Sequence, residues 1–218
     1  APKGVVHSHI PIRNTYERSQ SMGLTCNDVH MNYLPLFHIY AYSEITMMCI
    51  LTGAKQVLME TFNGKDALTL AEKEKATILH GFEAHWLDLL NAQKEGDFNL
   101  SLRMGTLPSG VESTIPIAEA VQETFCPTIS GFGMSETWAF VSISNLSHSQ
   151  EQRVHTSGYP MNDYQFKIVD NESFEEKANN EPGELWIKGY ATMKEYWNKP
   201  EETAKTIDQD GWIHSGDM

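Results

Sequence analysis

The stretch from residue 131 to residue 137 gathers the side chains with the greatest chemical potential in this chain. Its residues are, in order, Gly131, Phe132, Gly133, Met134, Ser135, Glu136 and Thr137. The glycines let the backbone approach a ligand closely, and the ring between them can stack on a base. The hydroxyl can bond a phosphate, and the carboxylate can hold a hard cation such as Mg²⁺. The pattern predicts a nucleotide-binding loop, although a tight turn with a capping serine explains it equally well when it is taken alone.

Two well-known glycine motifs do not fit this stretch. A dinucleotide-binding fingerprint needs glycine where Glu136 stands, and a nucleophile elbow needs glycine where Thr137 stands. Neither motif is therefore predicted here.

A second turn of this kind lies one strand–helix unit earlier, at Ser109, Gly110 and Val111. It follows a predicted strand and precedes a predicted helix, so its amides lie at the carboxyl end of a strand, where ligands bind in doubly wound sheets. A turn that simply requires glycine is the alternative. Two such loops on adjacent strands favour a shared nucleotide site more than either loop does alone.

Two further side chains have both a structural and a chemical interpretation. His38 lies in an apolar segment that leaves a strand, where a lone histidine is most often a buried structural group. Asp217 lies in a glycine-containing turn, where its carboxylate can accept hydrogen bonds from two ribose hydroxyls or form an Asx turn. The other histidines lack the i,i+4 spacing of helical metal ligands.

Alternating strands and helices position these loops. Their order predicts an α/β fold, a parallel sheet with helices on both faces. The predicted strands are 29–36, 55–59, 76–81, 102–107 and 128–131. The predicted helices are 8–21, 43–51 (capped by Ser43 and ended by Gly53), 65–75, 84–93 and one that Ser113 and Pro116 open.

The sequence pattern changes after about residue 140. Short alternating segments at 141–144, 164–169 and 184–188 are separated by turn residues, which is typical of antiparallel strands. We therefore expect an α/β subdomain over 1–140 and a smaller, mostly antiparallel β subdomain over 141–218.

Composition excludes several classes of function. Among 218 residues, 16 are basic and 29 acidic, and the net charge of −13 disfavours nucleic acid and anionic lipid as partners. No run of eighteen apolar residues occurs, so no transmembrane segment is predicted. Three scattered cysteines argue against a disulfide framework and fit a reducing compartment, so a cytoplasmic location is expected.

In their order along the chain, these motifs resemble those of the adenylate-forming (AMP-dependent) acyl-CoA synthetases and ligases. The resemblance runs from end to end. It is carried by Pro2–His9, Leu34–His38, Ser109–Val111, Gly131–Glu136, Pro182–Trp186 and Asp210–Asp217.

The resemblance implies a role for each candidate residue. Phe132 would stack on adenine and Ser135 would touch the α-phosphate. Glu136 would ligate Mg²⁺, Asp217 would hold the ribose and Lys3 would flank the phosphate loop. The other residues implied for the nucleotide site are Ser109, Gly110, Val111, Gly131, Gly133 and Met134.

For the acyl group, the resemblance implies a pocket formed by His38, Tyr40, Gly133 and Trp138. His38 would lie between the acyl carboxylate and the nucleotide, which gives it a catalytic role beside Ser135 and Glu136. Acetyl-CoA synthetases place a tryptophan at the position of Gly133, so glycine there implies a medium- or long-chain or cyclic acid.

The implied reaction joins a carboxylic acid to CoA through acyl-AMP, with ATP and Mg²⁺. Alternatives are an acyl-AMP ligase without CoA transfer and a non-catalytic nucleotide-binding relative. Amino-acid activation is disfavoured, since such enzymes usually have aspartate at the position of His38.

Some family features are absent from the sequence or altered. Phe132 replaces a tyrosine, and Ser135 replaces a threonine. The glycine-rich phosphate loop proper would precede Pro2, and the small C-terminal domain with its lysine would follow Met218. We therefore expect an internal fragment of the large N-terminal domain, inactive on its own.

Overall fold

The computed structural model describes residues 2–218, and its first region is built on a five-stranded parallel sheet. The strands are β2 (Val29–Asn32), β3 (Lys55–Leu58), β4 (Ile78–His80), β5 (Met104–Thr106) and β6 (Thr128–Ile129), in the order β3-β2-β4-β5-β6. Every pairing in this sheet is parallel. The predicted α/β class is confirmed, although the strands are shorter than predicted.

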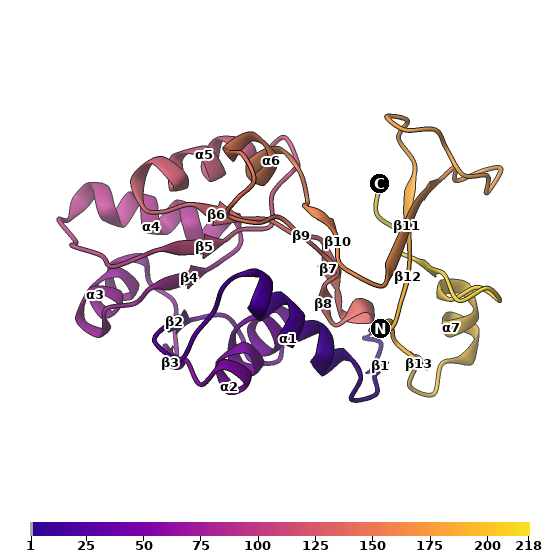
Figure 1. The fold of residues 1–218 in the computed structure, drawn as a ribbon, viewed down its shortest axis with the longest axis horizontal. Coiled ribbons are helices and arrows are strands. Elements are labelled where there is room, and N and C mark those ends of the chain that lie inside the picture. Colours follow the sequence, from indigo (N-terminus) through magenta and orange to yellow (C-terminus); the bar gives the residue numbers. More distant parts are fainter. Residues whose placement is uncertain (1) are drawn as a thin grey trace.

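Helices cover both faces of this sheet (Figure 1). One face carries α3 (Gly64–Glu74), α4 (Glu83–Glu95) and α5 (Ile115–Thr124), and the other carries α1 (Pro11–Ser21) and α2 (Met48–Thr52). A large apolar core containing the fully buried Trp86 lies beneath the first set of helices and extends to side chains within residues 40–49. A smaller core, in which Met48 meets Ile78 and Met104, lies beneath the second set. The central strands β4 and β5 are accordingly buried along their whole length, whereas the edge strand β3 is partly exposed.

The helix predicted over 43–51 differs from the structure. A π-helix, η1 (Tyr40–Met47), leads directly into α2, so Ser43 lies inside a helix and caps nothing. Ser43 is buried, and its hydroxyl accepts a hydrogen bond from Arg18 Nη2 at 2.7 Å. The predicted end at Gly53 is confirmed, because Gly53 adopts the left-handed conformation (φ 73°) that terminates helices.

The second region is mostly antiparallel, as predicted. Its main sheet pairs β11 (Tyr164–Val169), β12 (Glu184–Gly189) and β14 (Ile213–His214). Two short ladders connect it to the first region: β7 (Gly133–Met134) with β8 (Ala139–Phe140), and β9 (Ser142–Ile143) with β10 (Tyr159–Pro160). A 3₁₀ turn, η2 (Ser135–Thr137), joins β7 to β8. The short helices α6 (Gln150–His155) and α7 (Pro200–Thr206) were not predicted.

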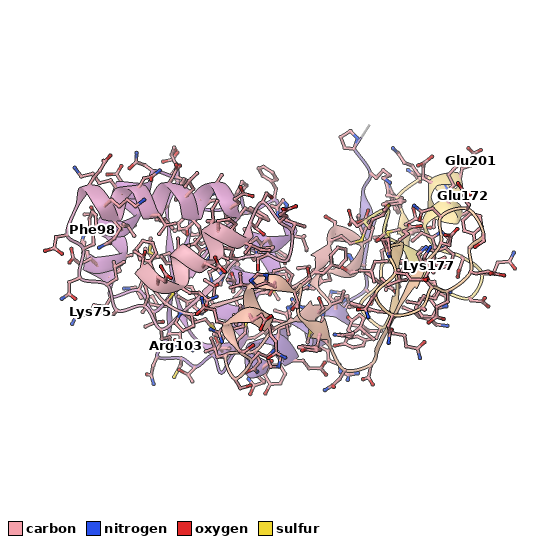
Figure 2. All side chains as sticks on the ribbon, turned by 90° about the horizontal axis from the view of Figure 1, so that it is seen from above. Lys75, Phe98, Arg103, Glu172, Lys177 and Glu201 are labelled. Carbon is pink, nitrogen blue, oxygen red and sulfur yellow. The ribbon has the colours of Figure 1, made fainter. Side chains whose placement is uncertain are left out.

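The beginning of the described chain belongs to the second region. Strand β1 (Val5–Val6) pairs antiparallel with β13 (Glu195–Tyr196), far along the sequence. Figure 1 accordingly places β1 beside β13. Figure 2 separates the labelled Lys75, Phe98 and Arg103 of the first region from Glu172, Lys177 and Glu201 of the second.

Two global features bear on the sequence predictions. Within residues 2–218, no helix combines the length and the apolarity needed to cross a bilayer. The three cysteines are free, and Cys49 and Cys126 are buried while Cys26 is exposed.

Candidate functional site

The loops that follow β5 and β6 meet at the carboxyl edge of the parallel sheet. Ser130 ties them together, since its hydroxyl accepts from the Ser109 amide at 2.9 Å and donates to the Ser109 carbonyl at 3.1 Å. A cavity of about 260 Å³ opens beside this junction, and we call it the aromatic cavity. Its lining residues are His38, Ile39, Tyr40, Phe82, Pro108, Ser109, Val111, Gly131, Phe132, Gly133, Ala139, Phe140 and Ser157.

Aromatic rings form much of the wall of this cavity. The Tyr40 ring lies 5.0 Å from that of Phe82 and 5.5 Å from that of Phe140, measured between centroids. The exposed His38 ring stands edge-on to Phe82 at 5.5 Å. Such a wall offers flat apolar surface to a planar or apolar ligand.

A buried chain of polar groups holds Tyr40 in this wall. Its hydroxyl lies 2.5 Å from Thr106 Oγ1, which lies 2.8 Å from His80 Nδ1, and His80 Nε2 lies 2.9 Å from His30 Nδ1. Burial lowers the pKa of His30 to about 4 and moves the pKa of His80 well below its usual value. Burial also raises the pKa of Tyr40. The chain is therefore neutral at pH 7, and it fixes the position of Tyr40 without an added charge.

A buried ion pair anchors the hairpin formed by β7 and β8. Arg18 Nη2 lies 2.7 Å from Glu44 Oε1, and both side chains are almost fully buried. Arg18 Nη1 donates to the Phe140 carbonyl at 2.9 Å, and the Phe140 amide donates to Glu44 Oε1 at 3.3 Å. Burial raises the pKa of Glu44, and the Arg18 guanidinium opposes that rise. The pair satisfies both backbone groups of Phe140 and so sets the position of the hairpin.

The same hairpin explains why residue 133 is glycine. A Cβ atom added at Gly133 would lie 2.0 Å from the carbonyl oxygen of Ala139, on the paired strand β8. A side chain at this position therefore meets the backbone of β8 first. The contact with β8 therefore does not support the open acyl tunnel expected from glycine at residue 133. Gly133 does, however, line the aromatic cavity.

A second cavity, of about 440 Å³, lies at the other end of the loop and is mainly polar. We call it the polar cavity, and its charged and polar lining includes Lys3, Glu136, Glu184, Tyr196, Lys205 and His214. Lys3 Nζ lies 4.2 Å from the centroid of the Tyr196 ring, and the Tyr196 hydroxyl donates to Glu136 Oε1. The hydrogen bond to Tyr196 raises the pKa of Lys3, so Lys3 stays cationic at neutral pH.

The structure divides the predicted site residues into three groups. His38, Tyr40, Ser109, Val111, Gly131, Phe132 and Gly133 line the aromatic cavity. Lys3, Met134 and Glu136 line the polar cavity. Gly110, Ser135, Trp138 and Asp217 are absent from both sets of described lining residues.

The residues outside the cavities lie in distinct places. Ser135 is exposed between Met134 and Glu136 of the polar cavity, and its carbonyl lies 2.7 Å from His7 Nε2. Asp217 is exposed and follows Gly216, which lines the polar cavity. Trp138 turns elsewhere: its Nε1 donates to Thr15 Oγ1 at 3.1 Å. The structure therefore does not bring Trp138 to the aromatic cavity.

The sequence prediction missed Phe82 and Phe140 of the aromatic cavity and Tyr196 of the polar cavity. Tyr196 is the most informative of these. Nothing in its local sequence signals a functional role, and it contacts Glu136 through tertiary packing, in which β13 pairs with β1 and the Met193 amide donates to the Glu136 carbonyl. The contact between a phenol and a carboxylate 60 positions apart has no sequence signature of its own.

The residues present are compatible with Mg²⁺ bound together with a nucleotide. Across residues 2–218, no three His, Cys, Asp or Glu side chains come together as a metal-binding group. Mg²⁺ is commonly held by one or two carboxylates and the phosphates of a substrate. Glu136, in a polar cavity beside Lys3, can supply such a single carboxylate.

Comparisons with known proteins identify the family of the chain. The family model for the AMP-binding enzyme matches residues 1–197. The 4-coumarate–CoA ligase of Pinus taeda is 30% identical over 231 residues, which cover 100% of this chain and 42% of the relative. The medium-chain acyl-CoA ligase ACSF2, mitochondrial, of Homo sapiens is 29% identical over 226 residues, which cover 100% of this chain and 37% of the relative.

A comparison with solved structures also finds a coenzyme A synthetase. The O-succinylbenzoate coenzyme A synthetase of Bacillus subtilis in complex with AMP superposes with a TM-score of 0.83 at 25% identity, over 99% of this chain and 43% of that one. The chain thus spans about two fifths of the length of these relatives. The predicted resemblance is confirmed, and the chain belongs to the family of AMP-binding enzymes, whose members similar to it include acyl-CoA ligases.

Proposed function

We propose that the full-length protein activates a carboxylic acid with ATP and transfers the acyl group to CoA. A carboxylate oxygen attacks the α-phosphorus of ATP, which gives acyl-AMP and pyrophosphate. The CoA thiol then attacks the acyl carbon, and AMP leaves. The observation that carries this proposal is the shared loop: residues 131–133 line an apolar cavity, and residues 134 and 136 line a polar one.

For the nucleotide, we assign the base to the end of the loop at the aromatic cavity. Phe132 stacks on adenine, and the turn at Ser109, Gly110 and Val111 forms the edge of the base site. Gly131 and Gly133 allow close approach of the backbone. Asp217 accepts hydrogen bonds from the ribose hydroxyls, and its position next to Gly216 of the polar cavity supports this role.

The phosphates extend into the polar cavity. Ser135, exposed between two residues that line this cavity, donates to the α-phosphate. Glu136 holds Mg²⁺, which when bound neutralises charge on the phosphoryl oxygens. Lys3 adds a fixed positive charge beside the same phosphates, and Met134 forms part of the cavity wall.

We propose that the acid is a medium- or long-chain or cyclic one. The rings of Tyr40, Phe82 and Phe140 support this choice, because they offer apolar surface to a chain or a ring. His38, at the rim of this wall, orients the carboxylate towards the nucleotide. The roles of Gly133 and Trp138 in the acyl pocket remain predictions.

The test is acid-dependent exchange between ATP and pyrophosphate by the full-length protein. A panel from acetate to palmitate, with benzoate and a cinnamate added, ranks the acids by kcat/KM. We expect the longer or ring-bearing acids to exceed acetate. If folded protein supports no exchange with any acid, adenylation is excluded. If acetate ranks first, the proposed acid class is wrong.

Two further outcomes separate the alternatives. Exchange without thioester formation when CoA is added identifies an acyl-AMP ligase. Binding of AMP without exchange identifies a non-catalytic relative. Acyl-CoA formation, measured by mass spectrometry, supports the complete proposal.

We also propose a cytoplasmic location. The free cysteines, two of them buried, support a reducing compartment. One relative carries the word mitochondrial in its name, so fractionation of cells with a mitochondrial marker is the deciding experiment.

A further inference from the structure

The carboxylate of Glu136 is held from one side only. Its Oε1 accepts a hydrogen bond from the Tyr196 hydroxyl. Within residues 2–218, Oε2 has no hydrogen-bond partner, and the side chain lines the polar cavity. One oxygen is therefore engaged by the protein, and the other is left for a ligand.

We infer that Tyr196 is a positioning residue that orients the Glu136 carboxylate for a divalent cation bound with the nucleotide. The inference rests on the proposed function, because that function brings the cation to Glu136. Tyr196 does not touch the reacting atoms, so its contribution is geometric.

The backbone around Tyr196 is docked against the same turn. The Met193 amide donates to the Glu136 carbonyl at 2.7 Å, three residues before Tyr196. Tyr196 is 2% exposed, and its own amide donates to Thr203 Oγ1 at 2.9 Å. The backbone that carries Tyr196 is thus attached both to the turn of Glu136 and to α7, and the buried ring is held between them.

Lys3 completes the arrangement from the opposite end of the chain. Its ammonium lies 4.2 Å from the centroid of the Tyr196 ring, a cation–π distance. Strand β1, two residues further on, pairs Val5 with Tyr196. One tyrosine therefore contacts both the cation and the carboxylate that the proposed function assigns to the phosphates.

The physical effect concerns the freedom of the glutamate. A free glutamate side chain samples many rotamers, and a cation that binds it must select one. The hydrogen bond from Tyr196 makes this selection in advance. Partners that orient a metal ligand in this way typically contribute 10- to 100-fold in metal affinity.

A purely structural role for Tyr196 is the competing explanation. Its ring lies in a small core with Met193 and Ile213, and the partly buried Val5, Met134 and Ile207 pack against that core. Tyr196→Phe keeps the ring and removes only the hydroxyl, so it separates the two roles. Tyr164→Phe is the matched control: Tyr164 is a buried tyrosine on β11 whose hydroxyl has no partner within residues 2–218.

The experiment titrates Mn²⁺, as a probe for Mg²⁺, into the full-length protein with ATP and follows free Mn²⁺ by electron paramagnetic resonance. We expect Tyr196→Phe to raise the dissociation constant of Mn²⁺ in the ternary complex by about 10- to 100-fold. Affinity for ATP without metal should change by less than about threefold, and Tyr164→Phe should match the wild type in both measurements.

Other outcomes have distinct meanings. If Tyr196→Phe binds Mn²⁺ like the wild type, the positioning role is excluded while the proposed function stands. If wild-type protein gains no Mn²⁺ affinity from ATP, the proposed function fails first. A double-mutant cycle with Glu136→Gln is the second measurement: positioning predicts that Tyr196→Phe has no further effect on Mn²⁺ affinity once the carboxylate is gone, and additive effects overturn it.

Discussion

The aromatic and polar cavities share one loop but are built in different ways. The aromatic cavity lies over the ends of neighbouring parallel strands, and most of its wall comes from loops that follow β2, β4, β5 and β6. The polar cavity joins segments from far apart in the sequence: Lys3, Glu136, Tyr196 and the turn at Ser215–Gly216. The first depends on regular strand–helix succession, and the second on long-range strand pairing.

This difference shows which contacts make each cavity rigid. The aromatic cavity is backed by two buried polar systems, the His30–His80–Thr106 chain and the Arg18–Glu44 pair. The polar cavity depends on short two-residue strands and on a few side-chain contacts. We therefore expect changes behind the aromatic cavity to act on stability, and changes in the polar cavity to act on chemistry.

The largest expected effect lies behind the aromatic cavity. Arg18→Met leaves Glu44 buried without its partner, which typically costs about 3–5 kcal/mol in the free energy of unfolding. Arg13→Met is the control, because the Arg13 side chain is exposed and its ion pairs with Glu17 and Asp163 lie at the surface, where such pairs contribute much less than a buried pair. Urea denaturation of the full-length proteins measures both.

The double variant Arg18→Met with Glu44→Leu sharpens this test. It removes both charges, so it should recover much of the stability that Arg18→Met loses. Equal losses for the Arg13 and Arg18 variants would show that the buried pair does not hold the hairpin.

The polar cavity should respond to Glu136→Gln in activity rather than in stability. The amide keeps the size of the side chain but lacks the charge that a hard cation prefers. We expect exchange between ATP and pyrophosphate to fall by about 10²–10³-fold at low millimolar Mg²⁺, with an unfolding midpoint like the wild type. Glu195→Gln, an exposed acid on β13 next to Tyr196, is the control. Near-normal exchange in Glu136→Gln would make Glu136 a structural acid.

The same contrast explains what could be predicted from the sequence. The strand–helix alternation and the loops at Ser109 and Gly131 were predicted because their signals are local, and the sheet order places them together. Tyr196 and the pairing of β1 with β13 were missed, since contacts between distant segments leave no local pattern. The helix cap predicted at Ser43 is wrong, because the burial of Ser43 against Arg18 depends on tertiary packing.

A pH titration tests whether the chain behind Tyr40 is neutral. The folded pKa of His30 is about 4 and the unfolded value is 6.5, so between these values only the unfolded state binds the proton. The free energy of unfolding therefore falls as the pH drops from 6.5 to 4. Between pH 7 and 5, His30 contributes about 2 kcal/mol to this decrease.

The variant His30→Gln isolates the contribution of His30 to this pH dependence. Between pH 7 and 5, its free energy of unfolding should decrease by about 2 kcal/mol less than that of the wild type, whatever its stability at pH 7. The exposed His9 is the site of the control variant, His9→Gln, which should keep the wild-type slope. Asp28 does not interfere, because its lowered pKa of about 2 acts below this range. Glu44, whose pKa is raised by burial, contributes alike to the wild type and to the variant, so its effect cancels in the comparison. An unchanged slope in His30→Gln would show that His30 is charged in the fold.

The smallest expected effect concerns the loop that both cavities share. Phe132 is half-buried, and its backbone is held by Ser142 Oγ at 3.0 Å and by the Val141 amide at 2.9 Å, so its ring can be removed without releasing the loop. Phe132→Ala should weaken AMP binding by about fivefold to tenfold, the magnitude of one lost aromatic contact, while Phe132→Tyr should keep the affinity because it keeps the stacking face. Phe174→Ala removes a 62% exposed ring from the β-rich region and serves as the control. Calorimetric titration with AMP measures all four proteins. If Phe132→Ala binds AMP as tightly as Phe174→Ala does, the base does not lie on Phe132, and the aromatic cavity is left to the acid alone.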